Sequence, residues 1–246
     1  MNIKQCVVLA GGLGSRLGKL TKNTPKPLLK INNIPFLFYL ISKLKKEGIK
    51  KILILIWKKP KQFYNIDFNK VFDLDIKIIK ERKKLGTGGS IANCFSFLDK
   101  NFFLVNGDTI FDIPLKNLEK IFLKKKINLI TACHFSDKLN NKYKYFFNKK
   151  NNLINYKLYN NKKSWVSGGT YILNKKIFKK IKIKNIDLDR EIILQQFKKN
   201  KISAKKYYND FIDIGTKSDF IKTKNIIKKI FNNKKYKLKM INKSDK

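Results

Sequence analysis

The sequence has few acidic residues, few cysteines, a single histidine and no long apolar run. Its three cysteines, Cys6, Cys94 and Cys133, are isolated, which argues against a zinc ribbon or a disulfide framework and predicts a reducing compartment. The only histidine, His134, is interpreted as structural. No stretch approaches the roughly 18 apolar residues of a membrane-spanning helix, and the first residues lack the layout of a secretory signal. These absences predict a cytoplasmic protein.

The scarcity of acidic residues leaves a large positive charge. The 246 residues include 57 Lys and Arg but only 17 Asp and Glu, so the formal net charge is +40. A phosphate-rich partner such as nucleic acid would explain this charge, and so would a genome that favours lysine codons. Lysine is spread along the chain, and arginine, the better reader of bases, occurs only at Arg16, Arg82 and Arg190. We therefore expect no specific nucleic-acid partner, although the charge will attract a triphosphate.

Apolar runs alternate with helical patterns through the first half of the chain. We expect strands at 5–10, 51–57, 75–80 and 102–105, and helices at 35–47 and from the glycine loop 85–89 to about residue 99. Alternation of this kind predicts an α/β fold with a doubly wound, mostly parallel, Rossmann-like sheet.

The second half is more polar and richer in expected strands. The expected strands are 128–135, 143–147, 153–159 and 165–173, the expected helices are 188–199 and 217–231, and a strand pair is expected at 202–207 and 211–214. This pattern predicts a smaller antiparallel lobe that faces a substrate. We expect one domain over residues 1–231 and a basic, flexible tail over residues 232–246.

The most informative segment, residues 9–17, reads Leu-Ala-Gly-Gly-Leu-Gly-Ser-Arg-Leu. A buried strand opens here into three glycines, which let backbone N–H groups approach a phosphate: Gly11, Gly12 and Gly14. A dinucleotide-binding fingerprint would need glycine where Leu17 stands, and a Walker A loop would need another upstream glycine. Two further cations follow, because Arg16 brings a permanently charged fork and Lys26 stands between two prolines on a stiffened loop.

Gly-Gly-x-Gly-x-Arg-Leu, then Leu-Thr and Pro-Lys-Pro-Leu-Leu, resembles the signature of the sugar-phosphate nucleotidyltransferases, also called nucleotide-sugar pyrophosphorylases. Three later segments strengthen the resemblance, which covers residues from about 4 to 231: Leu85-Gly86-Thr87-Gly88-Gly89, Asn106-Gly107-Asp108 and Phe211-Ile212-Asp213-Ile214-Gly215-Thr216. The compact length and these motifs are most similar to the heptose 1-phosphate guanylyltransferase branch.

The resemblance implies a role for each matching residue. The nucleotide would be bound by Leu9, Ala10, Gly11, Gly12, Gly14, Gly86, Thr87 and Gly88. Arg16 and Lys26 would be catalytic, stabilising the leaving pyrophosphate and the reacting phosphates. Asp108 and Asp213 would hold Mg²⁺, an ion that takes one or two carboxylates and retains water and phosphate oxygens. Asp108 follows a core strand, where open α/β sheets bind their ligands.

The sugar side departs from the family pattern. The resemblance assigns the sugar phosphate to Asn106, Tyr143, Lys157, Gly168 and Gly169. Many members carry a Glu-Lys pair after an apolar strand, but this chain has Leu158 and Tyr159 at that position. Lys157, Lys162 and Lys163 are alternative replacements for the missing lysine.

The implied function is the joining of a nucleoside triphosphate, with GTP favoured, to a heptose or hexose 1-phosphate, giving a nucleotide sugar and pyrophosphate for surface polysaccharide. Mannose 1-phosphate guanylyltransferase, glucose 1-phosphate cytidylyl- or thymidylyltransferase and muramate 1-phosphate uridylyltransferase are alternatives. Two non-enzymatic alternatives are a nucleotide-sugar sensor and a nucleic-acid-binding protein. The base, the sugar and the oligomeric state, including a homo-oligomer, stay open.

Overall fold

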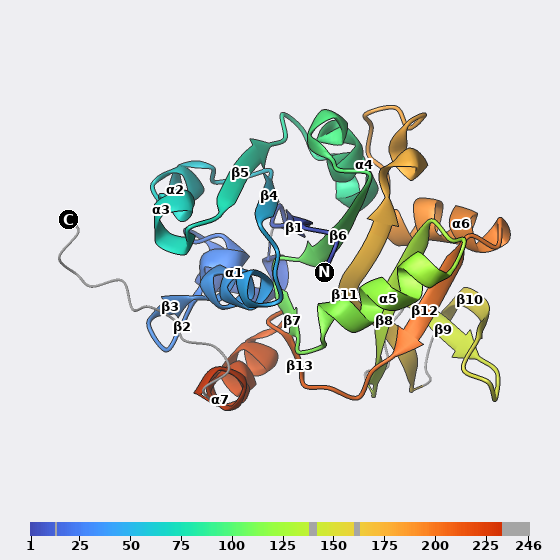
Figure 1. Cartoon of the computed structure of the whole chain (residues 1–246). Coiled ribbons are helices and arrows are strands. Elements are labelled where there is room, and N and C mark those ends of the chain that lie inside the picture. The colour runs from blue at the N-terminus through green and yellow to red at the C-terminus, as the bar shows by residue number, and fades with distance from the viewer. Residues whose placement is uncertain (13, 138–141, 160–162, 233–246) are drawn as a thin grey trace.

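A nine-stranded mixed sheet forms the centre of the protein (Figure 1). The computed structural model describes residues 1–12, 14–137, 142–159 and 163–232. The strands of this sheet are β1 (Gln5–Leu9), β4 (Lys51–Ile56), β5 (Asp75–Lys80), β6 (Asn101–Asn106), β8 (Leu129–Ser136), β9 (Lys142–Phe147), β10 (Leu153–Tyr159), β11 (Ser164–Asn174) and β12 (Ile202–Lys206).

The first half of the chain builds the parallel part of the sheet, in the order β6-β1-β4-β5. Its strands are continuously apolar because helices cover both faces. On β1, Cys6 and Val8 pack into one hydrophobic core, and Val7 packs into the core on the opposite face. The doubly wound α/β arrangement is confirmed.

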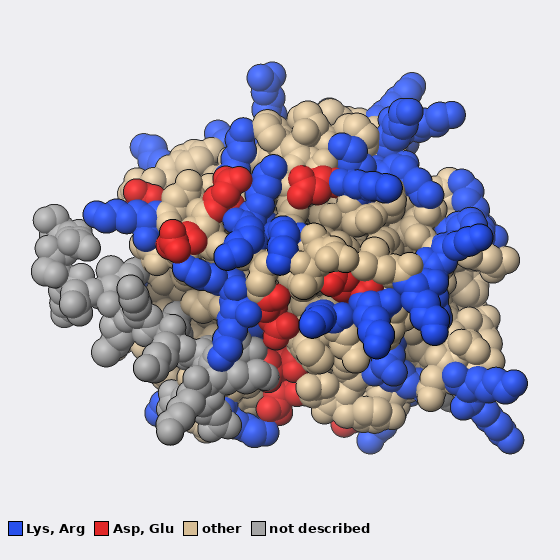
Figure 2. Space-filling model, viewed as in Figure 1, with Lys and Arg blue, Asp and Glu red and all other residues tan. Residues whose placement is uncertain are grey.

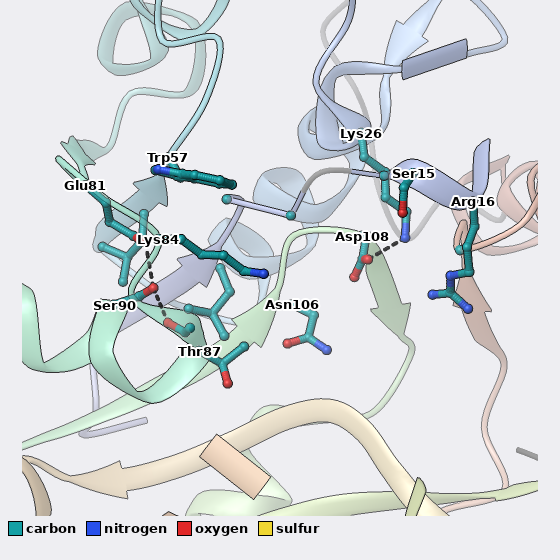
Figure 3. Close-up of a pocket in the computed structure, with 17 residues that line it drawn as sticks. Ser15, Arg16, Lys26, Trp57, Glu81, Lys84, Thr87, Ser90, Asn106 and Asp108 are labelled. Carbon is teal, nitrogen blue, oxygen red and sulfur yellow. Dashed lines mark hydrogen bonds and ion pairs between the residues drawn. The ribbon is translucent and has the colours of Figure 1, made fainter. Parts of the chain in front are cut away.

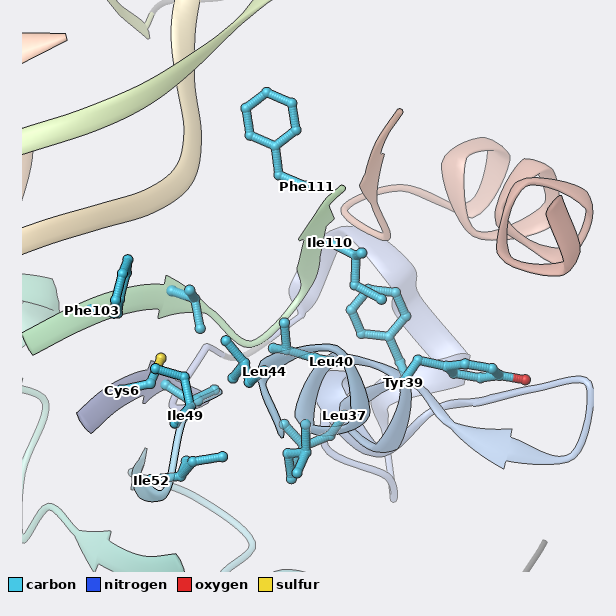
Figure 4. Close-up of a cluster of buried hydrophobic side chains, with 14 of the residues drawn as sticks. Cys6, Leu37, Tyr39, Leu40, Leu44, Ile49, Ile52, Phe103, Ile110 and Phe111 are labelled. Carbon is cyan, nitrogen blue, oxygen red and sulfur yellow. The ribbon is translucent and has the colours of Figure 1, made fainter. Parts of the chain in front are cut away.

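Helices divide between the two faces of the sheet. They are α1 (Phe36–Lys46), α2 (Lys61–Tyr64), α3 (Phe68–Phe72), α4 (Gly86–Asn93), α5 (Leu115–Lys124), α6 (Leu194–Lys198) and α7 (Lys217–Asn232), with helical turns η1 (Ser15–Thr21), η2 (Lys26–Leu28), η3 (Phe95–Phe97), η4 (Lys175–Phe178) and η5 (Leu188–Ile193). Helices α1, α5 and α7 contribute to one core, and α4, η5 and α6 pack against the other. Figure 4 shows Leu37, Leu40 and Leu44 of α1 near Cys6 and Ile52 of the sheet.

The expected antiparallel lobe is an extension of the same sheet. Residues 170–174 of β11 run antiparallel to β6, and the opposite edge of β11 pairs with β8. β9 and β10 form an antiparallel pair beyond the first residues of β11. The change from parallel to antiparallel pairing therefore occurs between β6 and β11.

The predicted strand pair 202–207 and 211–214 is wrong. β12 joins the main sheet in parallel beside β8, whereas β13 (Phe211–Asp213) pairs antiparallel with β7 (Thr109–Phe111). A further hairpin joins β2 (Lys30–Ile31) and β3 (Ile34–Pro35). Ile110 and Ile212 are both buried in the core beneath α1 and α7, which fixes the β7–β13 pairing.

One helix prediction is wrong at its end, and one ten-residue helix was not predicted. Helix α4 ends at Asn93 rather than near residue 99, because a short η3 turn follows and Leu98 is extended. Helix α5 was not anticipated, although Leu115, Leu118 and Phe122 recur at helical spacing and are buried.

The described part of the chain contains no helix that is long and apolar enough to cross a membrane. All three cysteines are free and buried. The cytoplasmic location and the homo-oligomer stay predictions. The predicted basic tail lies outside the described residues except for Asn232, which ends α7.

Candidate active site

A pocket of about 470 Å³ opens at the carboxyl ends of the parallel strands. The turn after β1, the ends of β4, β5 and β6, and the start of α4 form its walls. Figure 3 shows two ends of the pocket, one with Trp57, Glu81 and Ser90 and the other with Lys26 and Asp108. The pocket has the volume and the position of a ligand site in an open α/β sheet.

The glycine turn after β1 is shaped by tight packing at one glycine and by open space at another. Gly14 has φ +65°, and a Cβ built on it would lie 2.8 Å from Cγ2 of Thr21. The Thr21 hydroxyl donates a hydrogen bond to the Gly14 carbonyl at 2.9 Å, which holds the turn closed. A Cβ built on Gly12 would meet nothing within 4 Å. Gly11, Gly12 and Gly14 all line the pocket, as does Leu9, whereas Ala10 is buried behind them.

Lys26 is the buried cation at one end of the pocket. Only 5% of the residue is exposed, and Nζ lies 2.5 Å from Oδ2 of Asp108 and 3.9 Å from Oδ1 of Asp213. Arg16 lines the pocket nearby and reaches toward Gly215, because its Nη2 lies 3.2 Å from a Cβ built on that glycine. The cations Arg16 and Lys26 and the two aspartates, predicted from distant segments, thus occur together.

Tertiary structure brings the two aspartates together through backbone hydrogen bonds. Gly107 N donates to the Leu9 carbonyl at 2.9 Å, and Ile214 N donates to the Asp108 carbonyl at 3.1 Å. The side chains of Asp108 and Asp213 are 33% and 24% exposed, so solvent reaches both carboxylates. Two partly exposed carboxylates around one ammonium form a hard-oxygen donor set that fits a magnesium ion, although they hold Lys26 here.

The other end of the pocket contains side chains that the sequence analysis did not identify: Trp57, Glu81, Lys84 and Ser90. Trp57 follows β4 directly and Glu81 follows β5, so the rule that ligands bind at strand carboxyl ends could have found them. Glu81 is buried; Ser90 Oγ donates to its Oε1 at 2.6 Å, and Leu85 N donates to its Oε2 at 3.3 Å. Burial raises the pKa of Glu81, and these hydrogen bonds oppose the shift.

The glycines of the loop 85–89 have different environments. Gly86 and Thr87 line the pocket, and Gly86 has φ +68°. Gly88 is buried below the pocket, where its N–H donates to the Ile186 carbonyl at 2.9 Å. A Cβ on Gly88 would lie 2.7 Å from Cδ1 of Ile192. Close packing therefore explains why position 88 is a glycine. The predicted contact of Gly88 with the nucleotide stays a prediction.

A second pocket, of about 310 Å³, adjoins the first through Asn106, which lines both. Tyr143 and Gly169 also line the second pocket. Gly169 has φ +68° beside a bulge in β11, and a Cβ on it would lie 2.7 Å from Nδ2 of Asn106. Gly168 instead packs on Phe111, whose ring would overlap a Cβ there. Three of the five residues predicted for the sugar phosphate thus surround this pocket.

Among the residues predicted for the sugar phosphate, Lys157, like Gly168, lines neither pocket. Its ammonium lies 5.5 Å from the ring of Phe146 and 5.3 Å from the ring of Tyr159. The alternative Lys163 forms an ion pair with Asp137 at 3.7 Å, and Lys162 lies outside the described residues. The charged residues that do line the second pocket are Lys142, Asp187, Asp189 and Arg190.

Lysine and arginine side chains are scattered over the face seen in Figure 2, with acidic groups among them. On this face the positive charge forms no single stripe of the kind that tracks a nucleic-acid backbone. The visible distribution supports the interpretation of the charge as a general compositional feature.

A glycine-lined pocket beside a parallel sheet, with Arg16, Lys26 and Asp108 at one end and Asp213 next to Lys26, defines a nucleotide-binding α/β protein equipped for transfer at a phosphate. The chain belongs to the nucleotidyl transferase family, whose profile matches residues 5–230.

Three relatives illustrate this membership. The chain is 31% identical to D-glycero-alpha-D-manno-heptose 1-phosphate guanylyltransferase of Campylobacter jejuni over 88% of this chain and 96% of the relative. The enzyme of the same name from Aneurinibacillus thermoaerophilus is 29% identical over 89% of this chain and 96% of its own. The structure of HddC from Yersinia pseudotuberculosis is 25% identical, covers 91% of this chain and 99% of its own, and superposes with a TM-score of 0.78, or 0.76 when complexed with GMP-PN.

Proposed function

We propose that this nucleotidyltransferase joins GTP to a sugar 1-phosphate, with a heptose 1-phosphate as the favoured acceptor, and releases pyrophosphate. The observation that carries the proposal is the convergence of Lys26, Asp108 and Asp213 beside the glycine turn. The two guanylyltransferases and the GMP-PN complex among the relatives support the choice of base and acceptor.

The proposed mechanism assigns most of the catalysis to positioning and charge. The triphosphate lies along the backbone of Gly11 and Gly12, with Arg16 and Lys26 stabilising the charge that develops on the phosphates. The attacking group is a phosphate oxygen of the acceptor, which is already ionised at neutral pH and needs no histidine or serine base. Asn106 lies where the two pockets meet and is placed to donate an amide N–H to a phosphate there.

Magnesium is part of this proposal, with Asp108 and Asp213 as its protein ligands. When bound, the ion supplies charge neutralisation on the phosphate oxygens. With both carboxylates engaged by the ion, the Lys26 ammonium, which here lies 2.5 and 3.9 Å from them, would be available to the triphosphate.

The proposed base recognition rests on Glu81. Guanine presents two adjacent donors, N1–H and the N2 amino group, and a carboxylate can accept both at once. Glu81 is the one acidic side chain at the Trp57 end of the pocket among the described residues, and Trp57 offers an aromatic face for stacking. The other common bases lack this paired donor edge, so an acceptor-only group favours guanine.

A pyrophosphate-release assay tests the base. Four nucleoside triphosphates are crossed with heptose, mannose and glucose 1-phosphates, and the variant Glu81→Gln is compared with wild type. We expect GTP to give the highest kcat/KM, and Glu81→Gln to reduce the preference for GTP by about 10- to 100-fold, since one charged hydrogen bond is lost. Highest turnover with another triphosphate, or an unchanged preference in the variant, would contradict the assignment of Glu81.

The same assay, combined with measurements of GTP and nucleic-acid binding, separates the alternative functions. Best turnover with mannose 1-phosphate would select the mannose alternative. Binding of GTP without pyrophosphate release from any acceptor would select a nucleotide-sugar sensor. Binding of RNA or DNA that falls steeply with salt and ignores GTP would select a nucleic-acid-binding protein.

A further inference from the structure

Two cations line the second pocket and have no assigned role. Lys142 begins β9 and Arg190 lies in η5, so segments nearly fifty residues apart in the sequence supply the same wall. Within the described ranges, neither side chain forms an ion pair. Their charges therefore remain available for an anionic ligand.

The segment that carries Arg190 is fixed against the nucleotide loop. Leu188 N donates to Oγ1 of Thr87 at 2.8 Å, Gly88 N donates to the Ile186 carbonyl at 2.9 Å, and Ile186 N donates to the Leu85 carbonyl at 2.9 Å. Thr87 lines the nucleotide pocket. These three hydrogen bonds hold the second pocket in a fixed position relative to the first, as transfer between two bound substrates requires.

Two carboxylates order the same segment. Asp187 accepts a hydrogen bond from Arg190 N at 2.8 Å, and Asp189 accepts one from the Tyr156 hydroxyl at 2.9 Å. Burial raises the pKa of Asp189 to about 6, and the charge of Lys142 opposes the shift. The oxygens of Asp187 and Asp189 that remain free are acceptors for sugar hydroxyls, on the same pocket walls as the two cations.

We propose that Lys142 and Arg190 together bind the phosphate of the sugar 1-phosphate, in place of a lysine on β10. The inference rests on the proposed function, because it assumes that the second pocket holds the acceptor. Leu158 lines this pocket where a charged residue would otherwise stand, and Lys157 lies over two aromatic rings instead. A guanidinium fork with an ammonium beside it can hold several oxygens of one phosphate dianion.

The test compares Lys142→Met and Arg190→Gln with the matched control Lys157→Met. Initial rates are measured with GTP and the most active sugar 1-phosphate, and calorimetry measures binding of that sugar 1-phosphate and of the same sugar without phosphate. We expect each of the first two variants to raise KM and Kd for the sugar 1-phosphate by about 10- to 100-fold. In these two variants, KM for GTP and Kd for the unphosphorylated sugar should stay within about twofold of wild type. In Lys157→Met, KM and Kd for every ligand should also stay within about twofold of wild type. Arg190→Lys, which keeps the charge but loses the fork, should lie between wild type and Arg190→Gln.

Three outcomes would overturn the inference. They are an unchanged affinity for the sugar 1-phosphate in both variants, an equal loss for the unphosphorylated sugar, and a larger loss in Lys157→Met than in either. Thermal unfolding of each variant identifies a loss of affinity that comes from misfolding. If Arg190→Gln misfolds, the affinity of Arg190→Lys for the sugar 1-phosphate tests the inference instead. Failure of the proposed function would give a different result, because wild type would then release no pyrophosphate with any sugar 1-phosphate. Calorimetry would still measure how Lys142 and Arg190 affect the binding of the sugar 1-phosphate.

Discussion

The first pocket, proposed to bind the nucleotide, takes much of its wall from two glycine-rich segments, whereas the second pocket, proposed to bind the acceptor, collects side chains from five segments that are distant in the sequence. In the first, the glycine turn and the loop 85–89 present mainly backbone, and a glycine at the right position is visible in the sequence. In the second, Lys142, Tyr143 and Leu158 come from β9 and β10, and Arg190 comes from η5. A backbone-built site leaves a local motif, but a site built from side chains on separate strands leaves none.

The proposed metal ligands, Asp108 and Asp213, lie between these two cases, and removing one of them should have the largest effect. Asp108→Asn removes one of the two carboxylates proposed to act at the reacting phosphates, so we expect pyrophosphate release to fall by at least about 1000-fold. The measurement is kcat at saturating Mg²⁺, with Asp73→Asn as control, because Asp73 has a 97% exposed side chain and does not line the pocket. Turnover within tenfold of wild type in Asp108→Asn would remove this residue from the proposed mechanism.

Glycine substitutions sharpen the comparison within the nucleotide pocket itself. Gly86→Ala places a Cβ 2.5 Å from the Ile186 carbonyl oxygen at a positive φ, so we expect the free energy of unfolding to fall by about 2–4 kcal/mol. Gly12→Ala meets no atom within 4 Å, so its stability should stay within about 0.5 kcal/mol of wild type. Its methyl group enters the pocket instead, and KM for GTP should rise about tenfold.

Urea unfolding and steady-state kinetics separate the two effects. The comparison fails if Gly12→Ala unfolds as easily as Gly86→Ala, because glycine would then serve the fold at both positions.

The second pocket contains a carboxyl with a shifted pKa, Asp189, which interacts with Asp187, Lys142 and Tyr156. Burial raises its pKa from 3.8 to about 6, so the folded protein holds this proton more tightly than the unfolded chain. The tighter binding of this proton stabilises the folded protein; this stabilisation is complete below about pH 4 and is lost as the pH rises through 6. Asp189→Asn keeps the oxygen that accepts from Tyr156 and does not titrate.

Relative to wild type, Asp189→Asn should therefore gain up to about 3 kcal/mol of unfolding free energy between pH 4 and pH 7. Urea unfolding of both proteins at several pH values measures the difference. A constant difference across this range would mean that Asp189 ionises normally in the folded protein.

The sequence predicted the parallel core well because its information is local. Runs such as Lys51–Ile56 are apolar at every position, which identifies a strand covered on both faces. The predictions from sequence were poorer where a residue or strand contacts a segment that is distant in the sequence. β12 and β13 were predicted to pair because they are adjacent in the chain, but β12 pairs with β8 and β13 pairs with β7. Lys157 read as a phosphate ligand from its position in a motif, yet its ammonium lies over two rings.

The sequence by itself determined the class of fold, the glycine turn and the identities of Lys26 and Asp108, because each depends on residues close together in the chain. Only the tertiary structure decided that Trp57 and Glu81 line the far end of the pocket and that Lys142 and Arg190 share a wall. The physical reason is that strand pairing brings together residues many positions apart, and the pairing is set by total buried contact rather than by any local pattern.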